Sequence, residues 1–511
     1  MPRKYRAAIF GCFVFVSLLT RGLFLRIPIL DIDEAAHIVG SWQVLAGKLL
    51  YTDFVDNKPP LLYVYYAVCQ LLLGRGMFAV HLLTVLFTVP FTAYAASAFF
   101  DHQRKGIFAG LLFLLFSAAF LAHDMLAANA EILMLPAGAW AVVLLRRSRS
   151  WTQPLRIAGA GFLIAAGFLF KYQIALWLPA IVLPAALEAM VMGRHKKIAA
   201  SLILLSTSFV LPLIFTYIYF AYKNGQGELV FWTITNNFGY AANPILFREA
   251  IGRAVGSIFP FLIATAPLWW MAWRSLSLYD SPYQLVLIVS LLMFTAPAAF
   301  IGFRFYPHYL VQFYFPLAIA AAPAVSEMLT RPLRRPAILF AGCCLLLIGG
   351  FTLANAILYF GDARVYRETD PVFANVGKRL QTDACYSGAN LFVWGYAPSF
   401  YYYAQLRPAS RFAVLAQSRL TGYISGNTES VRGKVDTAKQ VSEQQWNLLM
   451  QDLQRNQPTY IIDTSPAGIY RWNRYPMSDY PRLDGLVRKN YDKLDTVDEV
   501  VVYRRKDCRS R

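Results

Sequence analysis

Apolar runs alternate with short polar gaps along the first two-thirds of the chain. Most runs hold about twenty residues, which is enough to span the hydrocarbon core of a bilayer as a helix. The pattern therefore predicts a polytopic α-helical membrane protein with about eleven transmembrane helices, or about thirteen as the alternative total. The expected spans are residues 7–25, 77–100, 106–123, 132–145, 156–170, 173–192, 198–220, 253–273, 283–303, 308–326 and 337–360.

Several of the gaps carry clusters of basic residues, which set the expected orientation. The clusters lie at residues 102–105, 146–149, 194–197 and 331–335. Basic residues concentrate in cytoplasmic loops, so the N-terminus is predicted to be cytoplasmic, with outer loops at residues 27–76, 123–131 and 221–252. The first span contains Arg21 and is not followed by a clear small-residue cleavage site, so we interpret it as a retained helix and not as a signal peptide.

One apolar stretch is too short for a comfortable crossing. Residues 61–73 carry Tyr63, Tyr65 and Tyr66 within this short run. Aromatic side chains of this kind favour the membrane interface. We therefore expect a helix that lies at the outer surface or dips into it.

The composition changes near residue 361, where spanning runs end and charged residues become frequent. Strand-like segments at 390–394, 460–463 and 497–503 alternate with helix-like segments such as 442–455. We expect a membrane domain over residues 1–360 and an extracytoplasmic α/β domain over residues 361–511. Cys385 and Cys508 flank the strands, and the sequence leaves a disulfide or two free thiols as alternatives.

The overall composition excludes one class of partner. Hydrophobic residues make up 57% of the chain, yet the formal net charge of +19 could suggest nucleic-acid binding. The basic residues lie in the gaps and are not interleaved with stacking aromatic side chains, as single-strand binding requires. We therefore expect the lipid bilayer, and no nucleic acid, as a partner.

Polar residues without an obvious structural reason gather on the predicted outer face. They are Asp31, Asp33, Glu34, His37, Asp53, Asp56 and Lys58, then Asp124, Asn129, Glu131 and Lys171, then Asn236, Asn237, Tyr240, Asn243 and Arg248, and finally Arg304, Tyr306, His308 and Tyr309. Ionisable groups at membrane depth are costly and indicate function. A carboxylate can take a proton from a hydroxyl, and Lys or Arg can bind a phosphate. The combination predicts group transfer from a lipid-phosphate donor.

The first outer loop carries an ordered motif. The order is Asp33-Glu34, Trp42, Gly47, Tyr51, Asp53-Phe54 and Lys58-Pro59-Pro60. It resembles the first outer loop of bacterial GT-C glycosyltransferases, in particular the protein O-mannosyltransferase-like branch that includes the lipid A aminoarabinose transferases. The resemblance continues at residues 129–131, 304–309 and 393–412, so it covers most of the chain.

The resemblance implies the GT-C fold and a function. Members of this branch take a sugar from a polyprenyl-phosphate donor, invert its anomeric carbon and pass it to a cell-envelope acceptor on the outer face of the bacterial inner membrane. Two positions depart from the pattern: His81 stands where many relatives carry Arg, and Asn57 where the aminoarabinose transferases carry an acid. The metal site and sugar preference of those transferases are therefore not carried over.

Roles follow for individual residues. Asp33 is the expected general base, although an Asp before Glu-Ala-Ala is also typical of a helix N-cap. Lys58, followed by two prolines, is expected to bind the donor phosphate, with a snorkelling lysine as the alternative. The other candidates are Glu34 and Glu131 for catalysis, Arg304, His308, Lys171 and Tyr306 for the phosphate, and Asn129, Asp124, Tyr240 and Asn243 for the acceptor or sugar.

Other functions remain as alternatives. The sequence contains no zinc motif and no phosphate loop, and the resemblance implies transfer without a metal or another cofactor. A flippase that moves a lipid-linked sugar without chemistry is the main alternative, and a membrane scaffold built around the outer domain is a third. Polar groups gathered on one face, with no obvious repeat, argue against a transporter.

Overall fold

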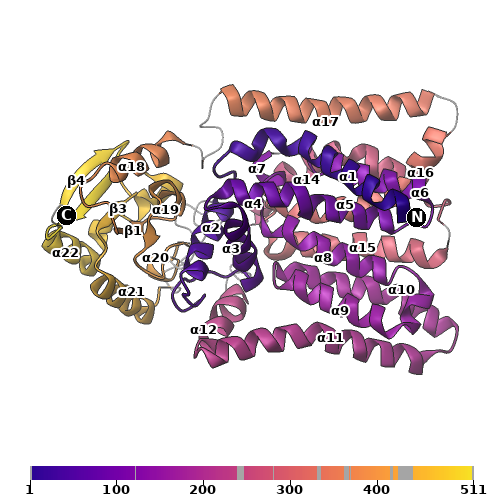
Figure 1. Ribbon diagram of the computed structural model, residues 1–511, viewed down its shortest axis with the longest axis horizontal. Coiled ribbons are helices and arrows are strands. Elements are labelled where there is room, and N and C mark those ends of the chain that lie inside the picture. The colour runs from indigo at the N-terminus through magenta and orange to yellow at the C-terminus, as the bar shows by residue number, and fades with distance from the viewer. Residues whose placement is uncertain are drawn as a thin grey trace.

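The computed structural model describes residues 3–120, 122–238, 247–279, 281–330, 335–361, 368, 370–414, 418–423 and 441–508. A bundle of long helices forms one part, and a smaller domain that contains the sheet sits against one end of it (Figure 1). This arrangement confirms the predicted class, a polytopic helical protein with a C-terminal α/β domain.

The bundle helices run roughly parallel to one another (Figure 1). They are α1 (Arg3–Arg21), α4 (Met77–Leu83), which continues through the π-helical turn η2 (Thr84–Thr88) into α5 (Val89–Ala98), α6 (Gln103–Phe116), α8 (Ala130–Leu144), α9 (Pro154–Phe168), α10 (Trp177–Val191), α11 (His195–Tyr222), α14 (Phe247–Arg274), α15 (Pro282–Phe300), α16 (Tyr314–Thr330) and α17 (Arg335–Gly361). Among the described residues, seven stretches are long and apolar enough to cross a membrane. The other four predicted spans coincide with α6, α8, α9 and α17, so every predicted crossing is a helix of this multi-pass membrane protein.

Two shorter helices, α2 (Ile32–Leu45) and α3 (Pro60–Leu73), lie across the end of the bundle next to the C-terminal domain (Figure 1). One side of α3 packs on α2, and the helix exposes five aliphatic side chains. These are Val64, Val68, Leu71, Leu72 and Leu73. A helix that crosses the bundle direction with an apolar stripe exposed is the arrangement predicted for a surface helix.

The third outer loop is partly helical. It contains α12 (Gln226–Val230) and the π-helical turn η5 (Phe231–Thr235). The candidates Tyr240 and Asn243 fall within 239–246, outside the described residues, so their expected contact with acceptor or sugar stays a prediction.

The C-terminal domain is built on a five-stranded sheet of order β2-β1-β3-β5-β4. The strands are β1 (Asn390–Trp394), β2 (Arg407–Pro408), β3 (Tyr460–Asp463), β4 (Tyr491–Val497) and β5 (Val500–Arg505). β1 pairs in parallel with β2 and β3, whereas β5 pairs antiparallel with β3 and β4. Its helices are α18 (Pro371–Gln381), α19 (Ser399–Ala404), α20 (Ser418–Thr421), α21 (Glu443–Asn456) and α22 (Pro481–Asn490).

The strand predicted at residues 497–503 is part of a hairpin. Asp498 and Glu499 both have positive φ, 48° and 65°, and form the tight turn between β4 and β5. Such a turn matches the right-handed twist of the flanking strands. β4 escaped prediction because it is rich in charged, exposed side chains, which is typical of a protected sheet edge.

Cys385 and Cys508 form a disulfide, which resolves the alternatives left by the sequence. The bond joins the segment before β1 to the segment after β5, across 123 positions of the chain. It therefore closes almost the whole domain into one loop.

The C-terminal domain docks on the first outer loop. The Val55 amide donates a hydrogen bond to the Arg411 carbonyl (3.0 Å), and the Trp42 ring stacks on Tyr402 with centroids 6.2 Å apart. α19 packs on α2 over this contact. The loop that carries the main candidate residues is thus held between the bundle and the C-terminal domain.

Candidate active site

The start of α2 decides which aspartate is available for chemistry. Asp31 has an extended backbone and its carboxylate accepts a hydrogen bond from the Asp33 amide (3.0 Å), so Asp31 is the N-cap. Capping satisfies an amide that the helix cannot pair itself. The N-cap role considered for Asp33 therefore belongs to Asp31, which leaves the Asp33 carboxylate for another partner.

That partner is Lys58, whose Nζ lies 2.7 Å from Asp33 Oδ2. The two side chains are 16% and 21% exposed, so the pair can be reached from outside. The Tyr51 hydroxyl donates to the Lys58 carbonyl (2.8 Å), and Pro59 restricts the backbone of the residue before it, so the backbone at Lys58 is well fixed.

The pair changes the proton affinity of both groups. Burial is the largest single influence and would raise the pKa of Asp33. The combined attraction of Lys58, which is the strongest of these contributions, and of His37, His308 and Lys171 outweighs burial and holds this pKa well below its usual range. Burial would likewise lower the pKa of Lys58, but the Asp33 carboxylate, together with Tyr309, Glu131 and Asp56, raises it well above its usual value. In this state Asp33 is ionised but a weak base.

Glu34 has a different environment from its neighbour. Its side chain is fully buried, and three donors surround the carboxylate: the Leu30 amide (2.8 Å), the Ala128 amide (2.6 Å) and His81 Nε2 (2.8 Å). Glu34 thus ties α2 to α4 and to the segment before α8. Because both carboxylate oxygens are occupied, the geometry favours a positioning role over the catalytic role expected for Glu34, and it gives His81 a structural partner.

A second ion pair lies deeper. Lys171 Nζ is 2.7 Å from Glu131 Oε1, and the side chains are 6% and 1% exposed. Lys171 Nζ also lies 5.0 Å from the centroid of the Tyr309 ring. Burial lowers the pKa of Lys171, against the attraction of Glu131. The two groups are committed to each other, so the geometry favours a framework role over the expected catalysis by Glu131 and phosphate binding by Lys171.

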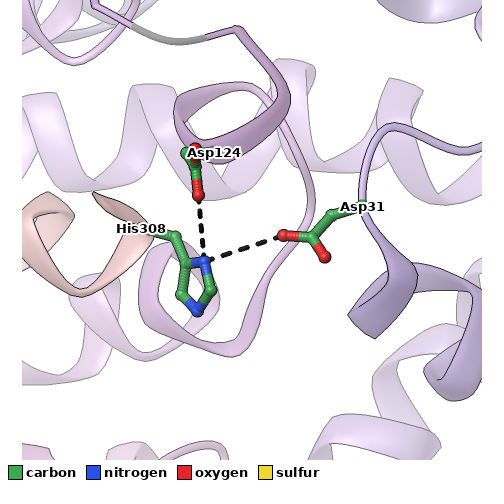
Figure 2. A group of neighbouring side chains, drawn as sticks. All are labelled: Asp31, Asp124 and His308. Atoms are coloured by element: carbon green, nitrogen blue, oxygen red, sulfur yellow. Dashed lines mark hydrogen bonds and ion pairs between the residues drawn. The ribbon is translucent and has the colours of Figure 1, made fainter. Parts of the chain in front are cut away.

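Three segments that are distant in sequence meet at His308 (Figure 2). His308 Nδ1 lies 3.1 Å from Asp124 Oδ1 and 3.7 Å from Asp31 Oδ2. Asn129 Nδ2 donates to Asp31 Oδ2 (2.9 Å), and the Tyr306 ring stacks on His308 with centroids 5.6 Å apart. Burial raises the pKa of Asp31 to about 6, which His308 opposes. The predicted convergence of the first loop, the second loop and residues 304–309 is thus observed.

The same three side chains are the group in the described chain that could hold a metal ion. Asp31, Asp124 and His308 each offer a ligand atom, and these atoms lie within 4.8 Å of one another. Carboxylate and imidazole ligands suit several divalent cations. However, the Asp31 oxygens already accept from Asn129 and from the Asp33 amide. A proton on His308 Nδ1 would be donated to Asp124 at 3.1 Å and would attract Asp31 at 3.7 Å. The arrangement of Asp31, Asp124 and His308 is therefore explained at least as well by a protonated His308 as by a bound metal cation.

Arg304 lies in an unusual turn before this group. Gly302, Phe303 and Phe305 have positive φ values of 71°, 53° and 52°. Non-glycine residues in this conformation cost about 1–3 kcal/mol each and tend to occur at functional sites. The turn buries the Arg304 side chain, which is 1% exposed, while Phe303 is 64% exposed. Arg304 is therefore held inside the protein close in sequence to His308.

Comparison with known proteins gives a clear result for the fold. No protein-family model and no curated protein matches the sequence. Among solved structures, ArnT from Cupriavidus metallidurans bound to undecaprenyl phosphate aligns with a TM-score of 0.59 over 98% of this chain and 97% of that chain, at 13% identity. The chain has the GT-C fold. ArnT in the apo state aligns with a TM-score of 0.57 over 96% and 97% of the two chains, again at 13% identity.

The GT-C fold was the one implied by the sequence resemblance, and the likeness over both chains confirms it. No site role was assigned from the sequence to four of the polar residues noted in the first outer loop, and the structure places two of them, Asp31 and His37, at the site. Asp31 could not be separated from Asp33 by sequence, because either could cap α2. His37 follows Asp33 by four residues, and this one-turn spacing on a helix could have drawn attention to it.

Proposed function

We propose that the protein is an inverting glycosyltransferase that moves a sugar from a polyprenyl-phosphate donor to a cell-envelope acceptor. The Asp33–Lys58 pair carries this proposal, since it places a base 2.7 Å from a cation suited to a phosphate. ArnT, which has the same fold, was crystallised with undecaprenyl phosphate, and this supports a lipid of that class as the donor carrier.

In the proposed reaction, Lys58 changes its partner. The donor phosphate competes with Asp33 for the ammonium group. Once Lys58 contacts the phosphate, the attraction that depressed the pKa of Asp33 weakens, while burial still acts to raise this pKa. Donor binding would therefore turn a weak base into a stronger one at the moment it is needed.

The transfer step then needs one base and no separate acid. The oxygen of the acceptor hydroxyl attacks C1 of the sugar on the face opposite the phosphate, and its proton passes to Asp33. The bond between C1 and the phosphate oxygen breaks, and the electron pair leaves with the lipid phosphate. Lys58 stabilises the charge on that leaving group, and we assign the buried Arg304 as a second cation for it.

We further propose that transfer needs no metal ion or other cofactor. Chelation with EDTA should leave turnover unchanged, because the charge of a protonated His308 can offset those of Asp31 and Asp124. The assay compares untreated protein, chelated protein and chelated protein supplied with Mg²⁺, Mn²⁺ or Zn²⁺. Loss of turnover that one of these cations restores would contradict the proposal and assign the group in Figure 2 as a metal site.

The proposed location is the bacterial inner membrane, with the N-terminus in the cytoplasm and the C-terminal domain outside it. The disulfide between Cys385 and Cys508 supports this orientation, because disulfides form and persist in oxidising compartments. The site would then open on the outer face, where polyprenyl-phosphate sugars and envelope acceptors meet.

The deciding experiment is turnover of radiolabelled undecaprenyl-phosphate monosaccharides by the purified protein in native lipid extract. The wild type should move label from the donor into one acceptor fraction, and Asp33→Asn should not. Protein-dependent movement of the lipid-linked sugar across vesicles, without any transfer, would favour the flippase alternative.

A further inference from the structure

His37 is a fully buried histidine with no hydrogen-bond partner for either ring nitrogen among the described residues. It lies on α2, one helical turn after Asp33. The rings of Tyr63 and Tyr66 contact it edge-on, with centroids 5.9 Å and 5.4 Å away. Packing therefore fixes the imidazole, while nothing in the described chain satisfies its polar atoms.

Its buried polar neighbours do have partners. The Tyr63 hydroxyl donates to Asp56 (2.6 Å), and the Tyr66 hydroxyl donates to the Ala128 carbonyl (2.9 Å). Gln70 on α3 donates to Ser41 (2.7 Å) and accepts from Trp42 (2.9 Å). The polar groups of Tyr63, Tyr66 and Gln70 are thus satisfied, whereas neither nitrogen of the His37 ring is.

A buried polar group without a partner lowers stability, and such groups in folded proteins require an explanation. An apolar residue at position 37 would avoid this cost, so the histidine indicates a partner from outside the chain. The charges that act most strongly on the ring are those of Asp33 and Lys58, which places it beside the proposed reaction site.

The chemistry of the ring narrows the identity of that partner. Burial lowers the pKa of His37 to about 3, so the imidazole is neutral, with one nitrogen a donor and the other an acceptor. A phosphate offers only acceptors and suits Lys58 better. A hydroxyl group both donates and accepts, and therefore matches the neutral ring.

We propose that His37 is a specificity-determining residue that binds a hydroxyl group of the donor sugar beside the phosphate held by Lys58. This inference rests on the proposed function and deepens it. It assigns the sugar subsite to the wall formed by α2 and α3.

The first test measures stability and needs no substrate. The full-length protein in lipid nanodiscs is compared with His37→Leu and with Gln70→Leu, the matched control on the facing helix whose amide is hydrogen-bonded. Gln70→Leu should lower the Tm, because it removes satisfied hydrogen bonds and strands their partners. His37→Leu should leave the Tm unchanged or raise it. A fall in Tm as large as that of Gln70→Leu would overturn the inference, since it would show that His37 supports the fold.

The second test measures thermal protection by undecaprenyl phosphate and by undecaprenyl phosphate carrying mannose, glucose or 4-amino-4-deoxyarabinose. The wild type should gain extra protection from one of the sugar-bearing lipids. His37→Leu should lose this extra protection, keep that given by undecaprenyl phosphate, and lose roughly tenfold in kcat/KM, as expected for one neutral hydrogen bond. His37→Gln, which retains a donor and an acceptor, should recover part of both.

The outcomes separate the two proposals. If His37→Leu keeps the sugar-dependent protection, or if only the KM for the acceptor rises, the donor-sugar assignment is overturned. If the wild type is protected by none of the four lipids and turns none over, the proposed function fails, and so does the assignment of the sugar.

Discussion

Two ion pairs at the same end of the bundle share their chemistry and their length but not their surroundings. Lys58 lies 2.7 Å from Asp33, and Lys171 lies 2.7 Å from Glu131. The first pair is 16% and 21% exposed, whereas the second is 6% and 1% exposed. A partly exposed pair can exchange a partner at lower cost than a buried pair, because loss of one member of a buried pair leaves an uncompensated charge inside the protein. The first pair therefore suits chemistry and the second suits the framework.

The largest effect should come from Asp33→Asn. The amide cannot take the acceptor proton, so turnover should fall by about 10³-fold, the range expected for loss of a general base. The Tm should change little, because the pair it breaks is partly exposed. Radiolabel transfer and thermal unfolding of the same preparation check both statements, and substantial turnover in this variant would refute Asp33 as the base.

The next largest effect should be on stability, from Lys171→Met. Removing this cation leaves Glu131 buried without its counter-charge, which costs about 3–5 kcal/mol. Lys58→Met is the matched control and should cost less, because Asp33 keeps partial access to solvent. The double variant Glu131→Leu with Lys171→Met should recover much of the loss, since neither charge remains. Equal losses in the free energy of unfolding for Lys171→Met and Lys58→Met would show that the two ion pairs contribute equally to stability, which would contradict their assignment to different roles.

The smallest of these effects should be a shift in the pH dependence of kcat/KM in Lys58→Met. In the wild type, Lys58 keeps the pKa of Asp33 low, so Asp33 stays ionised as the pH falls. In Lys58→Met the strongest attraction that opposes burial is lost, so the pKa of Asp33 rises and the acid limb of the kcat/KM profile should move to higher pH. The KM for the lipid donor should also rise, roughly tenfold for one phosphate contact. An unmoved acid limb would mean that a group other than Asp33 controls it.

The sequence alone predicted the features of the fold that follow from a repeated local pattern, above all the membrane-spanning helices. Every predicted crossing coincides with a bundle helix, because twenty apolar residues have few other stable states in a membrane protein. The predicted topology also explains why Asp31, Asp124 and His308 lie close together, since alternating spans bring every second loop to the same face of the membrane domain.

The sequence was not sufficient where a role depends on which partner a side chain finds. Asp33 and Glu34 are adjacent and both acidic, yet one meets a lysine and the other meets two backbone amides and His81. No local pattern distinguishes them, because Ala128 and Lys58 reach α2 from separate segments. The disulfide between Cys385 and Cys508 is similar, since it depends on how the sheet closes.

The docking of the C-terminal domain on the first loop limits how far the protein is modular. The Val55–Arg411 hydrogen bond and the Trp42–Tyr402 stack join the segment that carries Asp33 and Lys58 directly to the outer domain. In a chimera that exchanges only residues 361–511, the first outer loop would face a domain surface that lacks the matching contacts. A C-terminal domain taken from a homologous chain should therefore dock only when residues 31–60 are exchanged with it, so that the two segments are inherited as one unit.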